Sequence, residues 1–248
     1  MNAGQREAQK ERAASAAVSL VESGMTLGLG SGSTFRYALN ALARRIASGE
    51  LCDIRAVPSS GATAELAQAK GIPLLPLTAD LLLDLTIDGA DELDGDHRMI
   101  KGGGGALLRE KLIAEASARL AIAVDGSKIV KQLGKYPLPV EVLPFGWERQ
   151  QVFLAELGAE VSLRQDSLRQ DSQNRPYLTD NGNYILDCHF GAIAEPQTLA
   201  AAIKARTGII EHGLFIDLAT DVFVASQAGV QSSQRGSKNA AQPFLTQC

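Results

Sequence analysis

The chain is poor in the residues that mark several classes of protein. Its 248 residues include three cysteines, three histidines and one tryptophan, and aromatic residues make up only 5%. An odd number of widely spaced cysteines argues against a disulfide framework and favours reduced thiols, as in a cytoplasmic protein. Because no cluster of His and Cys offers ligands, we expect no metal site of that kind.

Charge and hydropathy argue against two further classes, nucleic-acid-binding proteins and membrane proteins. The 24 Lys and Arg residues are outnumbered by 28 Asp and Glu residues, so the net charge of −4 leaves no basic footprint for nucleic acid. No apolar run approaches the ~18 residues that span a membrane, and the polar N-terminus has no leader-like pattern. We therefore expect a globular protein that binds neither nucleic acid nor membrane, with 45% hydrophobic residues for its core.

Strand and helix patterns alternate through the first half of the chain. An alanine-rich amphipathic helix over 6–22 comes first, and helices are expected to begin near residues 34, 62 and 106. Short apolar strands are expected at 27–28, 54–57, 83–87 and 120–124. This order is the βαβ rhythm of a parallel sheet.

The pattern of expected strands and helices changes after residue 131. Prolines punctuate a strand at 140–143, and the patterns then predict a helix at 147–157, strands at 159–163 and 184–188, and a helix at 196–207. That order predicts a small α+β unit with antiparallel strands. We divide the chain into an α/β domain of residues 1–132 and 209–230, a small α+β domain of residues 133–208, and a tail of residues 231–248.

Two segments lie outside these patterns. The five residues at 163–167 are repeated at once at 168–172, which predicts a lengthened hairpin loop. From residue 227 onward the chain is rich in Ser, Gln and Ala, and we expect it to be loosely packed.

A run of four glycines, preceded by Lys101 and followed by an apolar helix, is the most informative stretch. Glycines expose backbone amides, and the helix start and the lysine add positive charge, so the run predicts an anion-binding site. Glu110 follows within the helix, and its neighbours three and four residues away are all apolar. This environment favours a functional role for Glu110 over a surface salt bridge.

Carboxylates cluster where an apolar strand ends, in the sequence Asp-Gly-Ala-Asp-Glu at 88–92. Ligands of open α/β sheets bind beyond the carboxyl ends of the strands, which places Asp88 and Asp91 for chemistry. An acidic turn or a loop for a hard cation are the alternatives, although the spacing fits no calcium loop.

A second glycine-rich turn, Gly-Leu-Gly-Ser-Gly-Ser-Thr at 28–34, joins a strand to a helix. The dinucleotide-binding pattern fails because Ser33 stands where the third glycine is required. Hydroxyls beside free amides at a helix start suit a phosphate, and the alternative is an ordinary capped helix.

Together these segments resemble ribose-5-phosphate isomerase of type A. Further support comes from Pro-Ser-Ser at 58–60, Val-Asp-Gly-Ser-Lys at 124–128, Thr-Asp-Asn-Gly-Asn at 179–183 and Glu-His-Gly-Leu-Phe at 211–215, in the order of that family. The resemblance implies an α/β fold, with a Rossmann-like parallel-sheet domain and a smaller ferredoxin-like α+β domain inserted near the C-terminus. It also implies a homo-oligomer, a dimer in the family.

The activity that the resemblance implies is interconversion of D-ribose 5-phosphate and D-ribulose 5-phosphate through an enediolate, in the non-oxidative pentose phosphate pathway, without a cofactor. By resemblance Glu110 is the base, Lys101 stabilises the enediolate, Asp88 opens the sugar ring, and Asp91 orients the substrate. The other residues that we expect to bind the pentose phosphate are Ser31, Gly32, Ser33, Thr34, Gly89, Ala90, Gly102, Gly103, Gly104, Lys128 and Lys10.

Two other functions remain open because fold does not fix function. A sugar-phosphate-sensing binding domain would bind the same ligand without needing Glu110 as a base. An amino-sugar phosphate deaminase of related fold would release ammonia.

Overall fold

The computed structural model describes residues 2–166 and 175–235. Its largest sheet has six strands in the order β13-β12-β6-β3-β1-β2. Five of these strands are parallel and β13 is antiparallel, as expected of a Rossmann-like sheet. The strands are β1 (Thr26–Leu29), β2 (Arg55–Pro58), β3 (Leu85–Asp88), β6 (Leu120–Asp125), β12 (Asp221–Ser226) and β13 (Gly229–Gln234).

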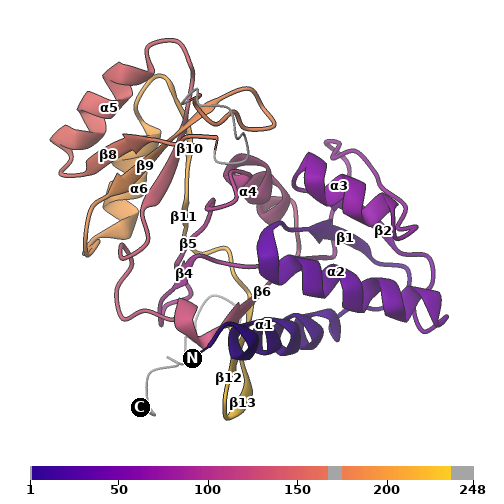
Figure 1. Ribbon diagram of the computed structural model, residues 1–248. Coiled ribbons are helices and arrows are strands. Elements are labelled where there is room, and N and C mark those ends of the chain that lie inside the picture. Colours follow the sequence, from indigo (N-terminus) through magenta and orange to yellow (C-terminus); the bar gives the residue numbers. More distant parts are fainter. Residues whose placement is uncertain (1, 167–174, 236–248) are drawn as a thin grey trace.

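Helices cover this sheet on both faces (Figure 1). On one face lie α1 (Ala3–Val18) and α2 (Gly32–Ala47), whose small and aliphatic side chains form the main core with β1 and β3. The other helices of this domain are α3 (Gly61–Gln68) and α4 (Leu107–Glu115). The close approach of α4 to β1 depends on Gly28, because a Cβ there would lie 2.4 Å from Ile113 Cγ2.

A second, four-stranded antiparallel sheet has the order β10-β7-β9-β8. Its strands are β7 (Leu138–Val142), β8 (Glu160–Leu163), β9 (Tyr184–His189) and β10 (Ile209–His212). With α5 (Trp147–Glu156) and α6 (Pro196–Lys204) they give a βαββαβ order around a separate apolar core. This order and strand arrangement are those of a ferredoxin-like domain, which confirms the expected fold class.

The predicted boundary at residue 208 needs correction. We assigned residues from 209 onward to the larger domain, but β10 pairs with β7 and completes the small sheet. The reason is that only one glycine, Gly213, separates β10 from β11 (Leu214–Phe215), so the chain passes from one sheet to another without a loop. Strand β11 belongs to a third sheet with β4 (Glu92–Leu93) and β5 (Met99–Ile100), which lies between the two larger sheets (Figure 1).

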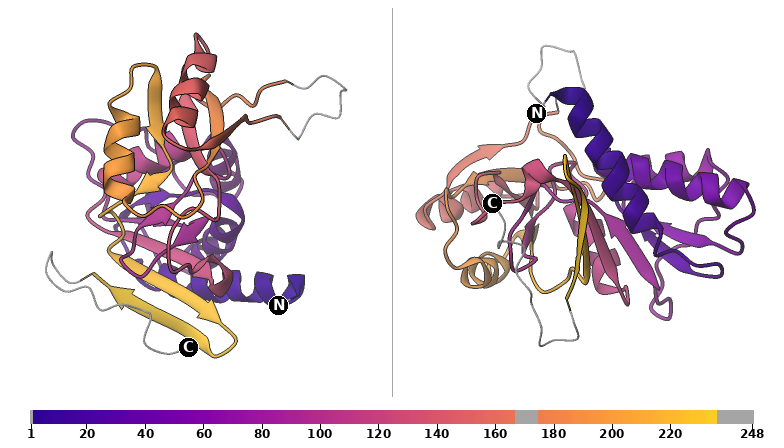
Figure 2. Two further views of the ribbon diagram at one scale, coloured as in Figure 1. Left: turned by 90° about the vertical axis from the view of Figure 1, so that its left-hand side faces the viewer. Right: turned by 90° about the horizontal axis from the view of Figure 1, so that it is seen from below.

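The expectation for the segment after residue 227 was also wrong in part. Residues of β13 pair with β12 along its whole length, and this hairpin forms one end of the molecule (Figure 2). Strand pairing here overrides a polar sequence that has little intrinsic strand preference. The rest of the predicted tail, from residue 236, lies outside the described residues.

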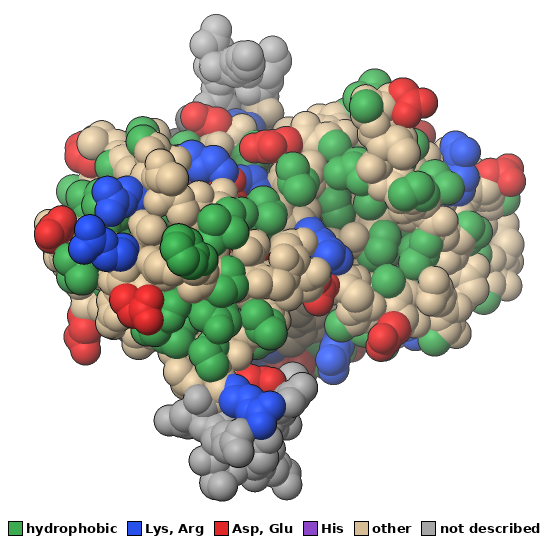
Figure 3. Space-filling model, turned by 90° about the horizontal axis from the view of Figure 1, so that it is seen from above, with side chains coloured by type: hydrophobic (Ala, Val, Ile, Leu, Met, Phe, Trp, Pro, Cys, Tyr) green, Lys and Arg blue, Asp and Glu red, His purple; other side chains and the backbone are tan. Residues whose placement is uncertain are grey.

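The five-residue repeat lies where β8 leads toward β9, an antiparallel pair. Its first copy begins at the end of β8, and its second copy falls outside the described residues. No helix among the described residues is long and apolar enough to cross a membrane. On the face shown in Figure 3, the Lys and Arg side chains are interspersed with Asp and Glu.

Candidate active site

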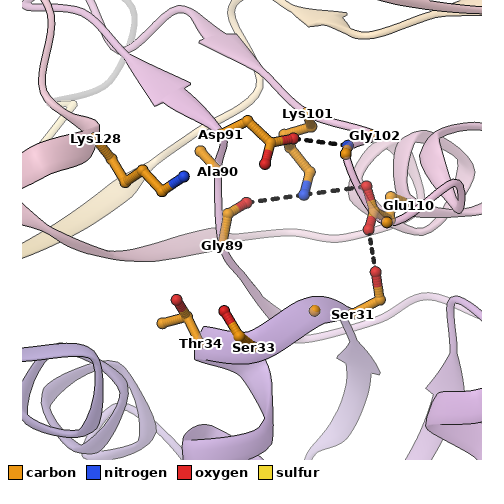
Figure 4. A pocket seen from close by; sticks show the side chains of 13 residues that line it. Ser31, Ser33, Thr34, Gly89, Ala90, Asp91, Lys101, Gly102, Glu110 and Lys128 are labelled. Carbon is orange, nitrogen blue, oxygen red and sulfur yellow. Dashed lines mark hydrogen bonds and ion pairs between the residues drawn. The ribbon is translucent and has the colours of Figure 1, made fainter. Parts of the chain in front are cut away.

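A small cleft forms where three loop segments meet. The segments are the start of α2, the residues after β3 and the glycine turn before α4, joined by Lys128 from the 3₁₀ turn η1 (Gly126–Lys128) (Figure 4). The cleft is lined by Ser31, Gly32, Ser33, Thr34, Gly89, Ala90, Asp91, Lys101, Gly102, Gly103, Gly104, Glu110 and Lys128.

Pairing of β1 with β3 brings the first two segments together. The strands are parallel, with Leu29 opposite Ile87, so their carboxyl ends meet at one edge of the sheet. The backbone N–H of Ser31 then donates to Asp88 Oδ1 at 3.1 Å. Gly30 makes this contact possible, because a Cβ there would lie 2.2 Å from Asp88 Cγ.

Lys101 is the electrostatic centre of the site. Its side chain is 4% exposed, and Nζ lies 2.8 Å from Asp88 Oδ2 and 3.2 Å from Glu110 Oε2. Nζ also donates to the Gly89 carbonyl at 2.8 Å. Burial opposes the charged ammonium, but the two carboxylates outweigh it and raise the pKa of Lys101. Lys101 therefore keeps its proton and its positive charge.

Asp88 is buried behind the cleft rather than lining it. Burial raises the pKa of Asp88 to about 6, with Lys101 acting in the opposite direction and Glu110 in the same one. A carboxyl with a pKa near neutrality can both accept and donate a proton under physiological conditions.

Glu110 projects from the first turn of α4 into the cleft and is buried. Its Oε1 accepts a hydrogen bond from the Ser31 hydroxyl, and its Oε2 faces the ammonium of Lys101 (Figure 4). The carboxylate is thus held from two sides, by side chains from α2 and from the glycine turn.

Asp91 holds the glycine turn in place. Its Oδ2 accepts from the backbone N–H of Gly103 at 2.8 Å. A Cβ at position 103 would lie 2.5 Å from Tyr136 Oη and 2.7 Å from Asp91 Oδ1, so any other residue there would displace these two side chains.

The start of α2 is open for an anion. Ser31 stands at the N-cap position but makes no capping hydrogen bond, because its hydroxyl donates to Glu110 instead. The interpretation as an ordinary capped helix is therefore wrong. The hydroxyls of Ser33 and Thr34 lie on one side of the cleft and the ammonium of Lys128 on the other (Figure 4), as a phosphate would require.

Lys10 is placed differently from the other residues that we singled out. It is not among the residues that line the cleft, and its Nζ pairs with Glu7 Oε1 at 2.8 Å. Binding of the pentose phosphate by Lys10 therefore stays a prediction.

The sequence did not reveal the residues of the small domain that support the glycine turn. Arg164 donates to the carbonyls of Gly102 and Gly103, and Tyr177 donates to that of Gly104. Arg164 lies in the first copy of the polar repeat, where we expected only a surface loop. No local pattern could have identified it, because its partners are about 60 residues away.

A second buried network holds the residue of α4 that follows Glu110. Lys111 donates to Glu211 Oε1 and to the His212 carbonyl, both at 2.7 Å. The Phe215 ring contacts both this lysine and Lys101, with its centroid 4.8 Å from Lys111 Nζ and 5.4 Å from Lys101 Nζ. Among the described residues, no group of three His, Cys, Asp or Glu side chains could hold a metal ion.

The raised pKa of Asp88 predicts how pH affects stability. Its carboxyl favours folding most when protonated, so its contribution is complete below about pH 4 and is lost as the pH rises through about 6. We expect the free energy of unfolding of the wild type, minus that of Asp88→Asn, to fall by on the order of 2 kcal/mol over this interval. Urea unfolding at a series of pH values measures it.

An exposed control is Asp80→Asn, because the Thr78 hydroxyl lowers the pKa of Asp80 and the sign of its effect is opposite. If the free energy of unfolding of the wild type, minus that of Asp88→Asn, is constant or rises from pH 4 to 6, the raised pKa of Asp88 is contradicted.

The comparisons with known proteins agree on one family. A family model described as ribose 5-phosphate isomerase A (phosphoriboisomerase A) matches residues 55–229. Ribose-5-phosphate isomerase A of Chloroflexus aurantiacus is 52% identical over 232 residues, which cover 93% of this chain and 95% of that protein. The protein of the same name from Gloeobacter violaceus is 50% identical, over 90% of this chain and 94% of its own length.

Solved structures with the same architecture carry the same name. A D-ribose-5-phosphate isomerase in complex with phospho-erythronic acid has a TM-score of 0.89 and 36% identity, covering 95% of this chain and all of that one. The enzyme of Plasmodium falciparum has a TM-score of 0.87 and 35% identity, with 93% and 100% covered. From this match in sequence and structure, the chain belongs to the ribose 5-phosphate isomerase A family.

Proposed function

We propose that this protein interconverts D-ribose 5-phosphate and D-ribulose 5-phosphate, the activity of its family and a step of the pentose phosphate pathway. The observation that carries the proposal is the contact of a buried ammonium, Lys101, with two carboxylates at the edge of an anion-binding cleft. The aldose and the ketose differ only in the positions of two hydrogen atoms, one on carbon and one on oxygen. A base and a fixed positive charge therefore suffice for the reaction.

Ring opening is the first step for a sugar that arrives as a furanose. We assign it to Asp88, whose pKa of about 6 suits transfer of a proton from the C1 hydroxyl to the ring oxygen. Asp88 is buried, so a small movement of Lys101 or of the sugar must bring it into reach. Asp91 lines the cleft, and we assign it to holding the substrate hydroxyls while it fixes the glycine turn.

Proton transfer between the two carbons is assigned to Glu110. The carboxylate takes the proton from C2 of the open-chain aldose, and the electron pair moves toward the C1 oxygen to give an enediolate. The same carboxyl returns the proton to C1, while the proton of the C2 hydroxyl passes to the anionic C1 oxygen, so that the C1 hydroxyl and the C2 carbonyl of the ketose form together. The charge of Lys101 stabilises the anionic oxygen, because its raised pKa keeps it protonated.

Replacing the base tests this assignment. We expect Glu110→Gln to lower kcat by roughly 10²- to 10⁴-fold, because a positioned general base contributes that much, while KM for ribose 5-phosphate changes little. Formation of ribulose 5-phosphate, followed in a steady-state assay, measures both constants.

The matched control is Glu115→Gln, an exposed glutamate at the end of the same helix. Unchanged turnover in Glu110→Gln would remove Glu110 from its role. A wild type that binds the sugar phosphate without converting it would instead favour the sensor, and ammonia release from an amino sugar phosphate would favour the deaminase.

The phosphate end of the cleft is assigned to Ser33, Thr34 and Lys128. We expect Lys128→Ala to raise KM for ribose 5-phosphate roughly tenfold or more, since a hydrogen bond to a charged group contributes ~1.5–3 kcal/mol, and to leave kcat within a few fold. Lys131→Ala, an exposed lysine three residues away, is the control. A kcat effect larger than the KM effect would place Lys128 at the reacting end instead.

We further propose that the protein works as a homodimer in the cytoplasm, which rests on family membership. Light scattering of the purified protein should give twice the chain mass of 26.2 kDa. The monomer mass at assay concentration would overturn the dimer, and recovery of the protein in a membrane fraction would overturn the location.

A further inference from the structure

Three consecutive peptide carbonyls of the glycine turn are held by side chains of the small domain. Arg164 Nη1 donates to the Gly102 carbonyl at 2.9 Å and to the Gly103 carbonyl at 3.2 Å. Tyr177 Oη donates to the Gly104 carbonyl at 3.4 Å. The turn that lines one side of the cleft is therefore oriented by the other domain.

Arg164 is itself held rigidly. Its Nε donates to Asp187 Oδ2 at 2.9 Å, and its Nη2 donates to Asp187 Oδ1, so the pair is bidentate. The arginine side chain is only 14% exposed and its partner 18%. A planar guanidinium can hold a carboxylate with one edge and peptide carbonyls with the other, which an ammonium cannot do.

The carbonyl directions decide where the amides of the turn point. No described peptide bond is cis, and in a trans peptide the C=O and the next N–H point in opposite directions. The N–H of Gly103 donates to Asp91, and that of Gly105 donates to the Gly102 carbonyl at 3.0 Å. The N–H of Gly104 has no hydrogen-bond acceptor among the described residues.

Gly104 lines the cleft and faces its reacting end. A Cβ at this position would lie 3.8 Å from Ser31 Oγ, the hydroxyl that donates to Glu110. The Gly103 carbonyl points to Arg164, which does not line the cleft, and the trans peptide turns the Gly104 N–H away from Arg164. An unpaired amide so placed is a donor for negative charge that develops on a substrate oxygen.

We propose that Arg164, held by Asp187, is a positioning residue that presents the Gly104 N–H to the anionic oxygen of the enediolate. This proposal rests on the proposed function and adds a second donor to Lys101. Arg164 touches no substrate in this account and acts by fixing one peptide plane. The small domain thereby contributes to transition-state stabilisation without placing a side chain in the cleft.

Arg164→Lys tests the proposal because it keeps the charge and removes the planar fork. We expect kcat for ribose 5-phosphate to fall roughly 10- to 100-fold, since loss of a complete oxyanion donor costs ~10²–10³. KM should stay within about threefold, because the donor acts on the transition state. Asp187→Asn should also lower kcat, by a smaller factor, and should likewise leave KM within about threefold.

A pair of ligands separates positioning from a general structural role. Phospho-erythronic acid carries a carboxylate at the reacting end, whereas erythritol 4-phosphate has the same carbons and a neutral hydroxyl there. In Arg164→Lys we expect the Kd of the acid to rise roughly tenfold and that of the alcohol to stay within about twofold, both measured by titration calorimetry. An equal loss for both ligands, or an unchanged kcat, would overturn the proposal.

Arg119→Lys is the matched control, because Arg119 also makes a bidentate pair, with Asp221, but its guanidinium donates to no carbonyl of the glycine turn. If Arg164→Lys does not fold, Asp187→Asn decides by the same two measurements. A wild type without isomerase activity would refute the proposed function, whereas an active wild type with an equally active Arg164→Lys would refute this inference alone.

Discussion

One buried positive charge organises the site. Lys101 lies between Asp88 at the end of β3 and Glu110 on α4, two carboxylates that would repel each other without it. Its own position depends on the backbone, since its N–H donates to the Gly213 carbonyl at 2.9 Å and its ammonium to that of Gly89. Both domains therefore contribute to where the charge lies, because Gly213 also donates to Pro139 of the small sheet.

Two parts of the structure position the residues of the cleft: one edge of the large sheet and the glycine turn. The large sheet places Ser31 and Asp88 by parallel pairing of β1 with β3, so their positions follow from strand register. The glycine turn gains its shape from contacts on both sides, with Asp91 on its amides and Arg164 on its carbonyls. A turn of glycines has little intrinsic preference, so these contacts select one conformation.

Local signals predicted the elements well where the sequence pattern and the tertiary contacts agree. Apolar runs predicted strands β1, β2, β3 and β6, and the strand end and the glycine turn marked Asp88, Lys101 and Glu110 as candidate site residues. The patterns failed at β10, which one glycine separates from β11, and at β13, whose polar residues pair only because β12 offers an edge. They also failed for Arg164, because it lies in a repeat that we interpreted as a surface loop.

The sequence by itself determined the family, the fold class and which residue types carry the chemistry, because glycine turns, strand ends and helix starts are local features with local signatures. Only the tertiary structure decided that the Ser31 hydroxyl donates to Glu110 rather than capping α2, that Lys10 pairs with Glu7 outside the cleft, and that Arg164 holds the glycine turn. Such choices depend on hydrogen-bond partners tens of residues apart, whose distance and burial arise only when the chain has folded.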